Sequence, residues 1–384
     1  MSVVSGPFDL AIVGAGIVGL AHALAAAKRG KRVVVIDRDA QANGASIRNF
    51  GFITVTGQQR GACWERALRS RDVWVEIAEA AGIPILHRGL CVSARRPEAA
   101  SVLAAFCETE MGAACRLLTR AEAERLVPQL APEAASAVLW SPHEVRVESR
   151  TAIPALARFL EQYHGVTMLR STLVKDATPP VIETTRGRIE AEAVIVCPGT
   201  DFQTLYPERI VAQGVTTCKL QMLRVDPGPA AGRFDAALMS DLGLVRYLGY
   251  AELPEAAALK RRLAEEQPAA LENGVHLIVV RSADGSLVVG DSHHYGDTID
   301  PFAPDSVDAI ILDEFDAVLD LPERRVVERW TGTYASASDK LMFVDRPRDD
   351  VRIVVVTSGT GASTSFAIAE EVIGELFGSS RTPT

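Results

Sequence analysis

Residues 8 to 37 constrain the fold more than any other part of the chain, because they read as a strand, a glycine-rich turn, a helix and a second strand that ends in an acid. Phe8 to Val13 and Val33 to Ile36 are short apolar runs with strand propensity. Ile17 to Arg29 is rich in Ala and Leu and is followed by Gly30, a typical helix C-cap. This order predicts a βαβ unit with two parallel strands.

The turn between the first strand and the helix, GAGIVG, has the spacing of a dinucleotide-binding loop. Gly14 permits a tight turn, Gly16 lets the backbone approach a pyrophosphate, and Gly19 allows the helix to pack closely on the strand. The helix N-terminus then offers free N–H groups to phosphates. Asp37 is placed to accept hydrogen bonds from ribose hydroxyls. From this unit we expect cofactor contacts from Gly14, Gly16, Ile17, Val18, Gly19, Asp37 and Arg38.

Length and charge narrow the function classes. The 384 residues suffice for two structural domains, and a formal net charge of −9 argues against a nucleic-acid partner, which needs a basic face. Six scattered cysteines, with no CxxC pair and no accompanying histidine spacing, predict reduced thiols and no metal site. Leu10 to Ala27 is as apolar as a membrane span, but three glycines and His22 interrupt it. We therefore expect no transmembrane segment, no signal peptide and a cytoplasmic protein.

The remaining chain alternates between two patterns. Helical patterns lie at residues 64–81, 97–112, 120–126, 151–163 and 366–377. From Val215 to Val289 the runs LQMLRV, GLVRYLGY, VHLIVV and SLVVG alternate like strands around a polar helical insert near residues 259–267. Ala193 to Cys197 and Val351 to Val356 return to the buried-strand pattern of the first segment.

These patterns predict an α/β fold with an α+β second domain. We expect a discontinuous nucleotide-binding domain of the Rossmann type from residues 1–85, 141–214 and 330–384. Residues 86–140 and 215–329 are expected to form a substrate domain around a largely antiparallel sheet.

A second glycine-rich turn lies near the C-terminus, where the run VRIVVV leads into Ser358-Gly359-Thr360-Gly361-Ala362-Ser363 and a helix. Such a helix N-terminus suits the pyrimidine edge of a flavin, where negative charge develops on reduction. We expect Gly359, Thr360, Gly361, Ala362 and Ser363 to contact a flavin, which makes FAD rather than NAD the expected dinucleotide. No cysteine lies in this turn, so the flavin is expected to be noncovalent.

The segment GASIRNFG (44 to 51), just after Asp37, resembles the Ser-x-Arg-Asn element of the D-amino-acid oxidase/glycine oxidase (DAO) superfamily of FAD-dependent oxidoreductases. The order of segments is similar over almost the whole chain, including AVIVCPG and SGTGAST. This resemblance implies a glutathione-reductase-type flavin domain and an antiparallel sheet that roofs the flavin. It also implies cofactor contacts from Ser46, Arg48, Asn49, Val174 and Gly199.

Several further segments resemble one clade of that superfamily, associated with bacterial phosphonate catabolism: SPHEVRVESR, LQMLRV, GDSHHYG, TGTYASASDK and TSGTGASTSF. That clade acts on 2-aminoethylphosphonate or its N-methyl or hydroxy derivatives. The stretch FITVTGQ (52 to 58) departs from the Trp-Pro version of the clade, which leaves the substrate variant open.

The carboxylate clamp of the amino-acid oxidases is missing. Where glycine oxidase has a Gly-Leu-Arg-Pro segment, this chain has Gly332-Thr333-Tyr334-Ala335, and Ser363 stands where sarcosine oxidase has a lysine. A phosphonate is therefore favoured over an α-amino acid, and it needs several charge-assisted donors. The candidates for binding it are His143, Arg224, His293, His294, Tyr334 and Lys340, with Arg146 and Arg150 in the same segment as His143.

The expected reaction is oxidation of an amine C–H bond by hydride transfer to the flavin, followed by hydrolysis of the imine to an aldehyde and an amine. For the N-methyl derivative the products are phosphonoacetaldehyde and methylamine. The electron acceptor, oxygen or another compound, stays open. The alternatives are a D-amino-acid or secondary-amine oxidase or dehydrogenase and a non-catalytic nucleotide-binding or tRNA-modification-like module, which would need a basic surface.

Overall fold

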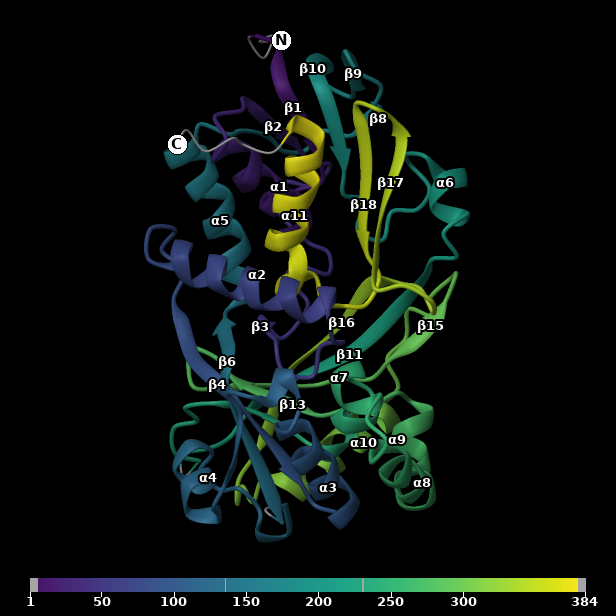
Figure 1. Ribbon diagram of the computed structural model, residues 1–384. Helices are drawn as coiled ribbons and strands as arrows, with labels where there is room; N and C mark the ends of the chain where they lie inside the picture. The colour runs from purple at the N-terminus through teal and green to yellow at the C-terminus, as the bar shows by residue number, and fades with distance from the viewer. Residues whose placement is uncertain (1–5, 135, 230, 379–384) are drawn as a thin grey trace.

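A computed structural model describes residues 6–134, 136–229 and 231–378, and it forms two β-sheets with helices around them (Figure 1). The domain ranges expected above include residues 1–5, 135, 230 and 379–384, which lie outside the described residues. Neither those ranges nor their boundaries are tested by the arrangement of the sheets, and they stay a prediction.

The first sheet is built around β1, which pairs in parallel with β2 on one side and β10 on the other. Within the described residues its strands run in the order β17-β18-β10-β1-β2-β7, with β9 and β8 continuing from β10. The bounds are β1 (Phe8–Val13), β2 (Val33–Ile36), β7 (Thr167–Leu169), β8 (Val174–Asp176), β9 (Val181–Thr184), β10 (Gly187–Val196), β17 (Met342–Arg348) and β18 (Val351–Val356).

The carboxyl ends of three parallel strands meet at one edge of this sheet. Val13 is in register with Ile36 on β2 and with Val196 on β10. The residues that follow these strands, Gly14 and Asp37 among them, therefore lie together. This is the edge at which open parallel sheets bind ligands.

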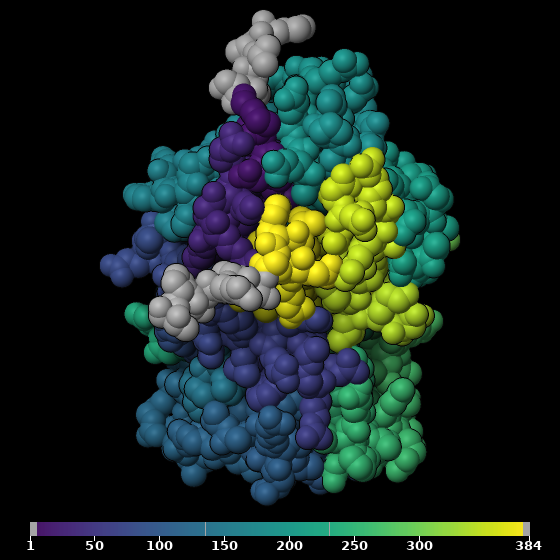
Figure 2. Space-filling view, turned by 45° about the horizontal axis from the view of Figure 1, so that its top comes forward, coloured from purple at the N-terminus to yellow at the C-terminus, as the bar shows by residue number. Residues whose placement is uncertain are grey.

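Four helices cover one face of the first sheet: α1 (Ile17–Ala27), α2 (Ala62–Ala78), α5 (Ser149–His164) and α11 (Gly361–Phe377). The first and last of them are packed together although more than 300 residues separate them, as the purple and yellow segments show in Figures 1 and 2. Trp74 of α2 donates a hydrogen bond to the carbonyl oxygen of Ala362 (2.8 Å), which holds the start of α11 in place. The two glycine-rich turns are thereby brought to the same side of the molecule.

The second sheet lies below the first in Figure 1 and is antiparallel except where β12 pairs with β4. Its strands are β3 (Phe52–Ile53), β4 (Ile85–Ala94), β5 (Arg116–Leu118), β6 (Ala137–Val147), β11 (Thr216–Asp226), β12 (Ala237–Met239), β13 (Ile278–Arg281), β14 (Leu287–Gly290), β15 (His294–Gly296) and β16 (Arg325–Ser336). Around it lie α3 (Pro97–Cys107), α4 (Arg120–Leu126), α7 (Leu248–Ala251), α8 (Ala256–Glu266), α9 (Pro268–Glu272) and α10 (Asp305–Val318), whereas α6 (Pro207–Val211) packs on the first sheet.

One predicted strand is wrong. The run GLVRYLGY alternates like a strand, but it forms a 3-10 helix η3 (Asp241–Val245) followed by the short helix α7. Gly249 lies so close to the preceding loop that a Cβ there would be 2.5 Å from the carbonyl oxygen of Gln58, and its N–H donates to Gly57 (2.9 Å). This tertiary contact outweighs a weak local preference for strand.

The other differences concern the ends of elements. The helix expected at 97–112 ends at Cys107, and a separate 3-10 turn, Glu110–Gly112, follows it. The C-terminal helix begins at Gly361 rather than at Phe366, so the glycine-rich turn itself forms its first residues. In the described part of the chain, no helix is both long enough and apolar enough to cross a membrane.

Candidate active site

Two neighbouring cavities, of about 410 Å³ and about 180 Å³, follow the carboxyl edge of the first sheet. Both are lined by Gly16, Ala45, Ser46, Cys197 and Gly199. The larger cavity reaches from this edge to the second sheet, so residues of both sheets line it. All residues expected to contact the cofactor line one cavity or both: Gly14, Gly16, Ile17, Val18, Gly19, Asp37, Arg38, Ser46, Arg48, Asn49, Val174, Gly199, Gly359, Thr360, Gly361, Ala362 and Ser363.

The smaller cavity carries the acid and the first glycine of the N-terminal motif. A Cβ on Gly14, whose φ is +105°, would lie 2.4 Å from the carbonyl oxygen of Cys197. The Asp37 carboxylate accepts the backbone N–H of Ala15 (2.6 Å) and that of Asp39 (2.8 Å). These bonds fix the carboxylate at the end of β2 and leave it lone pairs for hydroxyl donors.

The N-terminus of α1 lies where the two cavities meet. The backbone N–H of Ile17 donates to Ser46 Oγ (2.9 Å), and a Cβ on Gly16 would lie 2.9 Å from the same oxygen. Gly19 is held so close to Gly14 that a Cβ there would be 1.9 Å from its carbonyl oxygen. Glycines at these positions leave the backbone open to a large anion at a positive helix end, so the cradle fits a pyrophosphate.

The segment after Asp37 is fixed by its own polar side chains. Asn49 donates to the carbonyl oxygen of Ala45 (2.7 Å) and accepts the N–H of Gly51 (2.6 Å). Arg48 donates to Asn43 (3.1 Å) and to the carbonyl oxygen of Thr331 on β16 (3.4 Å). The loop therefore joins the edge of the first sheet to the second sheet along the cavity.

The C-terminal turn closes the far side of the larger cavity. Gly359 has a φ of +72°, and Ser363, in the first turn of α11, is buried and accepts the N–H of Thr54 (2.9 Å). The N-terminus of α11 thus faces the same space as that of α1. Two helix N-termini and an acid along one pair of cavities fit the two ends of a flavin dinucleotide.

Two of the residues expected to bind substrate line the larger cavity. Tyr334 is on β16, and its ring packs over Gly359. His293 lies between β14 and β15, with its ring centroid 6.3 Å from that of Tyr334 in an edge-on arrangement. Its Nδ1 is 2.9 Å from the carbonyl oxygen of Gly274, an acceptor, so Nδ1 carries the proton and Nε2 is left free.

Four other expected residues, His143, Arg224, His294 and Lys340, lie outside both cavities in the described structure. His294 is the first residue of β15 and, unlike His293, does not line either cavity. Lys340 donates to the carbonyl oxygen of Gln213 (2.9 Å) instead. His143 lies on β6, and its pKa is lowered mainly by burial.

The three arginines that were candidates for binding the phosphonate form ion pairs with carboxylates instead. Arg224 lies 3.1 Å from Glu328 and 3.5 Å from Glu148. Arg150 also pairs with Glu328 (2.8 Å), and the fully buried Arg146 pairs with Glu148 (3.3 Å). These guanidinium groups therefore form an ion-pair cluster away from the cavities. Local sequence could not predict this cluster, because it does not reveal which carboxylates the fold places beside each arginine.

The cavity contains an arginine that local sequence reasoning did not single out. Arg246 follows η3 in the segment predicted to be a strand, and it donates to Tyr295 Oη (3.2 Å). Within the described residues it forms no ion pair. Arg246 is half-buried, and its partner Tyr295 is 54% exposed. No local signal could identify it, since its position depends on how η3 and α7 pack against the loop at Gly57.

Three further groups meet in the cavity wall, although their sequence spacing matched no metal pattern. His276, Asp291 and His293 are buried, and their ligand-type atoms lie within 4.8 Å of one another. Burial raises the pKa of Asp291 to about 7, against the positive charge of Arg246. Burial also lowers the pKa of both histidines well below its usual range. The cavity thus holds neutral imidazoles, a carboxyl group that titrates near neutrality and a fixed cation.

A curated relative is similar to part of this chain. The chain is 30% identical over 209 residues to glycine oxidase of Geobacillus kaustophilus (strain HTA426). That match covers 50% of this chain and 54% of the relative, so it spans about half the length of the curated relative.

Solved structures with the same fold match at full length. Glycine oxidase of Geobacillus kaustophilus has a TM-score of 0.77 at 21% identity, with 99% of this chain and 97% of that chain covered. L-proline dehydrogenase of P. horikoshii has a TM-score of 0.78 at 19% identity, with 99% and 96% covered. L-α-glycerophosphate oxidase of Mycoplasma pneumoniae with FAD bound has a TM-score of 0.72 at 16% identity, with 97% and 95% covered.

The family model described as DAO, FAD dependent oxidoreductase, matches residues 9–374, which is nearly the whole chain. The residues along the two cavities fit the cofactor of that family, because two helix N-termini with close glycines and an acid follow one continuous edge of the sheet. The chain therefore belongs to the DAO family of FAD-dependent oxidoreductases, and its cofactor is FAD.

Proposed function

We propose that this protein oxidises the C–H bond next to the nitrogen of an amine that also carries a phosphonate group. The substrate class is 2-aminoethylphosphonate and its N-methyl and hydroxy derivatives. The imine formed would hydrolyse to a phosphonoacetaldehyde-type product and an amine. Sequence segments such as GDSHHYG and TGTYASASDK support this class through their resemblance to phosphonate-catabolic members of the family.

The observation that carries the proposal is the position of Arg246. The family's carboxylate clamp is replaced by Tyr334 on β16, while Arg246 lines the same cavity just after η3 and forms no ion pair in the described structure. A planar guanidinium binds the oxygens of a phosphonate by two parallel hydrogen bonds. Because Arg246 and Tyr334 come from different elements, Arg246 would hold the anion at another place than the family's carboxylate clamp.

The cavity residues have separate roles in this proposal. Arg246 holds the anion, with the hydroxyl of Tyr295 beside it, and the ring of Tyr334 packs over Gly359 in the cavity wall. Positioning of this kind fixes the reacting C–H against the cofactor and removes the entropic cost of a bimolecular encounter. FAD, when bound, accepts the two electrons of the oxidation.

A second candidate is the oxidation of an amino acid such as glycine or a secondary amine. The 30% identity to a glycine oxidase favours it. In that case Arg246 would bind a carboxylate. Under either reading the final electron acceptor is oxygen or another compound, which the rate of flavin reoxidation in air distinguishes.

An anaerobic reduction screen tests the proposal. The FAD-loaded protein is mixed with 2-aminoethylphosphonate, its N-methyl and 1-hydroxy derivatives, glycine, sarcosine and D-alanine, and loss of the visible flavin absorbance is recorded. We expect an aminophosphonate to bleach the flavin and phosphorus NMR to detect the phosphonoaldehyde. Bleaching by the amino acids alone would contradict the phosphonate assignment and support the second candidate.

A further inference from the structure

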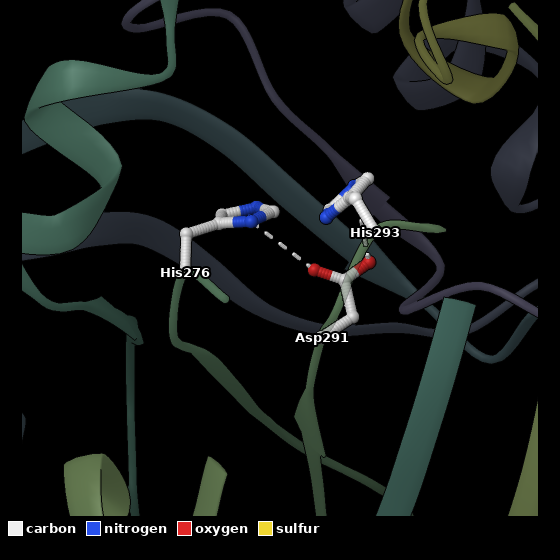
Figure 3. Close-up of side chains that lie close together, drawn as sticks. All are labelled: His276, Asp291 and His293. Carbon is white, nitrogen blue, oxygen red and sulfur yellow. Dashed lines mark ion pairs between the residues drawn. The ribbon is translucent and has the colours of Figure 1, made fainter. Parts of the chain in front are cut away.

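The buried group formed by His276, Asp291 and His293 has no role in the proposed reaction so far. Figure 3 shows the Asp291 carboxylate between the two imidazole rings, with His276 Nδ1 3.3 Å and His293 Nε2 3.9 Å from its oxygens. The backbones of His276 and Asp291 exchange two hydrogen bonds (2.9 and 3.2 Å). That pairing fixes both side chains on the same side of the cavity wall.

The carboxylate of Asp291 accepts no side-chain hydrogen bond in the described structure. Asp291 Oδ1 and His276 Nδ1 are fully buried and, although they lie 3.3 Å apart, form no hydrogen bond. The other nitrogen of His276, Nε2, lies 3.3 Å from Tyr247 Oη, and His293 Nδ1 donates to Gly274. A buried carboxylate without a hydrogen bond is costly, and such a group in the wall of a ligand cavity indicates that the ligand supplies a donor.

The charges around Asp291 indicate which donor that is. Arg246 is the fixed cation acting on it, and the other titratable groups that line this part of the cavity are His276, His293, Tyr247, Tyr295 and Tyr334. The buried Cys218 thiol, outside the cavity lining, also interacts with Asp291. Burial raises the pKa of the Tyr247 and Tyr334 phenols and of the Cys218 thiol. Around Asp291 the cavity wall therefore presents one fixed cation, Arg246, and one carboxyl group.

This pair of charges is complementary to a zwitterion with its anion at Arg246 and its ammonium at Asp291. A lone divalent cation would also suit two imidazoles and a carboxylate, but it would meet the positive charge of Arg246, which acts on all three groups. An ammonium that arrives with its own anion gives Arg246 a partner instead. The charge arrangement thus favours an aminophosphonate or another amino acid zwitterion over a metal ion.

We propose that Asp291, held by His276 and His293, binds the ammonium group of the substrate and accepts one proton from it. One N–H bond breaks, an O–H bond forms on the Asp291 carboxylate, and the electron pair stays on nitrogen. The neutral amine is the form that can lose the adjacent C–H with its two electrons. The inference rests on the proposed function only in taking an amine as the substrate.

The titration of Asp291 gives the step a direction with pH. Because burial raises its pKa to about 7, the carboxylate is protonated below neutrality and can accept a proton above it. The two neutral imidazoles do not compete for that proton, since burial lowers their pKa. The rate of flavin reduction at saturating amine should therefore rise through pH 7 and level off above it.

The first experiment compares two inert phosphonates of equal shape on the FAD-loaded protein. (2-Amino-2-methylpropyl)phosphonate has no hydrogen on the carbon bearing nitrogen, and (2,2-dimethylpropyl)phosphonate replaces its ammonium with a methyl group. We expect wild type to bind the first on the order of 10-fold to 100-fold more tightly, as measured by calorimetry. In Asp291→Asn this preference should fall to about 1 while binding of the methyl compound is unchanged.

The matched control is His294→Gln, the neighbouring histidine outside the cavity, which should keep the wild-type preference. FAD content and thermal unfolding of each variant identify a failure to fold. The reduction rate of Asp291→Asn should lose its rise through pH 7 and fall by about 100-fold or more. A wild-type preference retained by D291N, or a tightly bound metal whose removal abolishes activity, would overturn the proposal.

Failure of the two proposals can be told apart. If amino acids reduce the flavin and aminophosphonates do not, the proposed function fails. The Asp291 test is then run with 2-aminoisobutyrate and its methyl analogue, 2,2-dimethylpropanoate. A preference for the ammonium compound that disappears in D291N supports the inference, and a preference that survives overturns it.

Discussion

The ring of Tyr334 packs against Gly359, so that a Cβ built on the glycine would lie 3.2 Å from Cζ of the phenol. This contact joins β16 of the second sheet to the turn at the start of α11. The part of the larger cavity formed by β16 and the part formed by the glycine-rich C-terminal turn are therefore joined by these two residues. Substitution at either position should affect both parts.

Gly359→Ala should lower FAD retention. Its φ of +72° strains any L side chain by about 1–3 kcal/mol, and the new methyl group meets the Tyr334 ring. The measurement is the ratio of flavin to protein absorbance after purification, with thermal unfolding alongside. Gly165→Ala is the matched control, because Gly165 has a φ of +65° with nothing within 4 Å. That variant should lose stability and keep its FAD, whereas equal FAD content in both would contradict the prediction.

Asp37→Asn should weaken FAD binding by about 10-fold to 100-fold, since hydrogen bonds to a charged acceptor contribute about 1.5–3 kcal/mol. Titration of the apoprotein with FAD, followed by flavin fluorescence, measures the change. Asp9→Asn is the control at the other end of β1, where Asp9 also accepts a backbone N–H, that of Arg32 (2.6 Å). An unaltered FAD affinity in D37N would show that the acid only shapes the loop through Ala15.

Arg246→Met should raise the KM for the best substrate by about 100-fold while FAD content stays at the wild-type level, because a buried charge-assisted pair is lost. Steady-state kinetics and flavin absorbance measure both quantities. Arg224→Gln tests the rival position directly: Arg224 is tied to Glu328 outside the cavity, so this variant should lose thermal stability and keep its KM. A large KM effect in R224Q with none in R246M would place the anion at the other arginine.

Acid should destabilise the fold through His22. This residue is fully buried in α1, and burial lowers its pKa from 6.5 to about 4. Between those values the unfolded chain binds a proton that the folded chain does not, so stability falls as pH drops from 6.5 to 4, by about 3 kcal/mol from this group. Urea unfolding of wild type and His22→Leu across this range measures the difference. Above pH 6.5 the free energies of unfolding of the two proteins should differ by a constant amount. The same constant difference below pH 6.5 would contradict the prediction.

Local pattern was sufficient to predict the Rossmann-type unit and the cofactor FAD, while the individual contacts to FAD stay a prediction. The strand, turn and helix at residues 8–27 follow from apolar runs and glycine spacing, and the expected bounds of β1, β2 and β18 agree with the observed ones. Each half of this site lies on a short continuous segment, so the relevant atoms are placed by neighbouring residues. A Rossmann-type unit can be predicted for the same reason.

Local pattern did not reveal that Arg246, His276 and Asp291 line the larger cavity. Arg246 lies in a run that alternates like a strand, and it reaches the cavity only because Gly249 packs on the loop at Gly57. His276 and Asp291 face each other through backbone pairing between two segments 15 residues apart. Arg224 was a predicted anion ligand, but it pairs with Glu328 on the neighbouring strand β16, which lies about 100 residues later in the sequence.

The amino-acid sequence by itself determined that this chain binds FAD in a Rossmann-type fold, because backbone geometry at a few glycines and one acid specifies that site over short distances. The tertiary structure decided which charged residues line the larger cavity. Long side chains acquire their partners from strands and helices far away in the chain, and burial then sets whether Asp291 or an imidazole holds a proton near neutral pH.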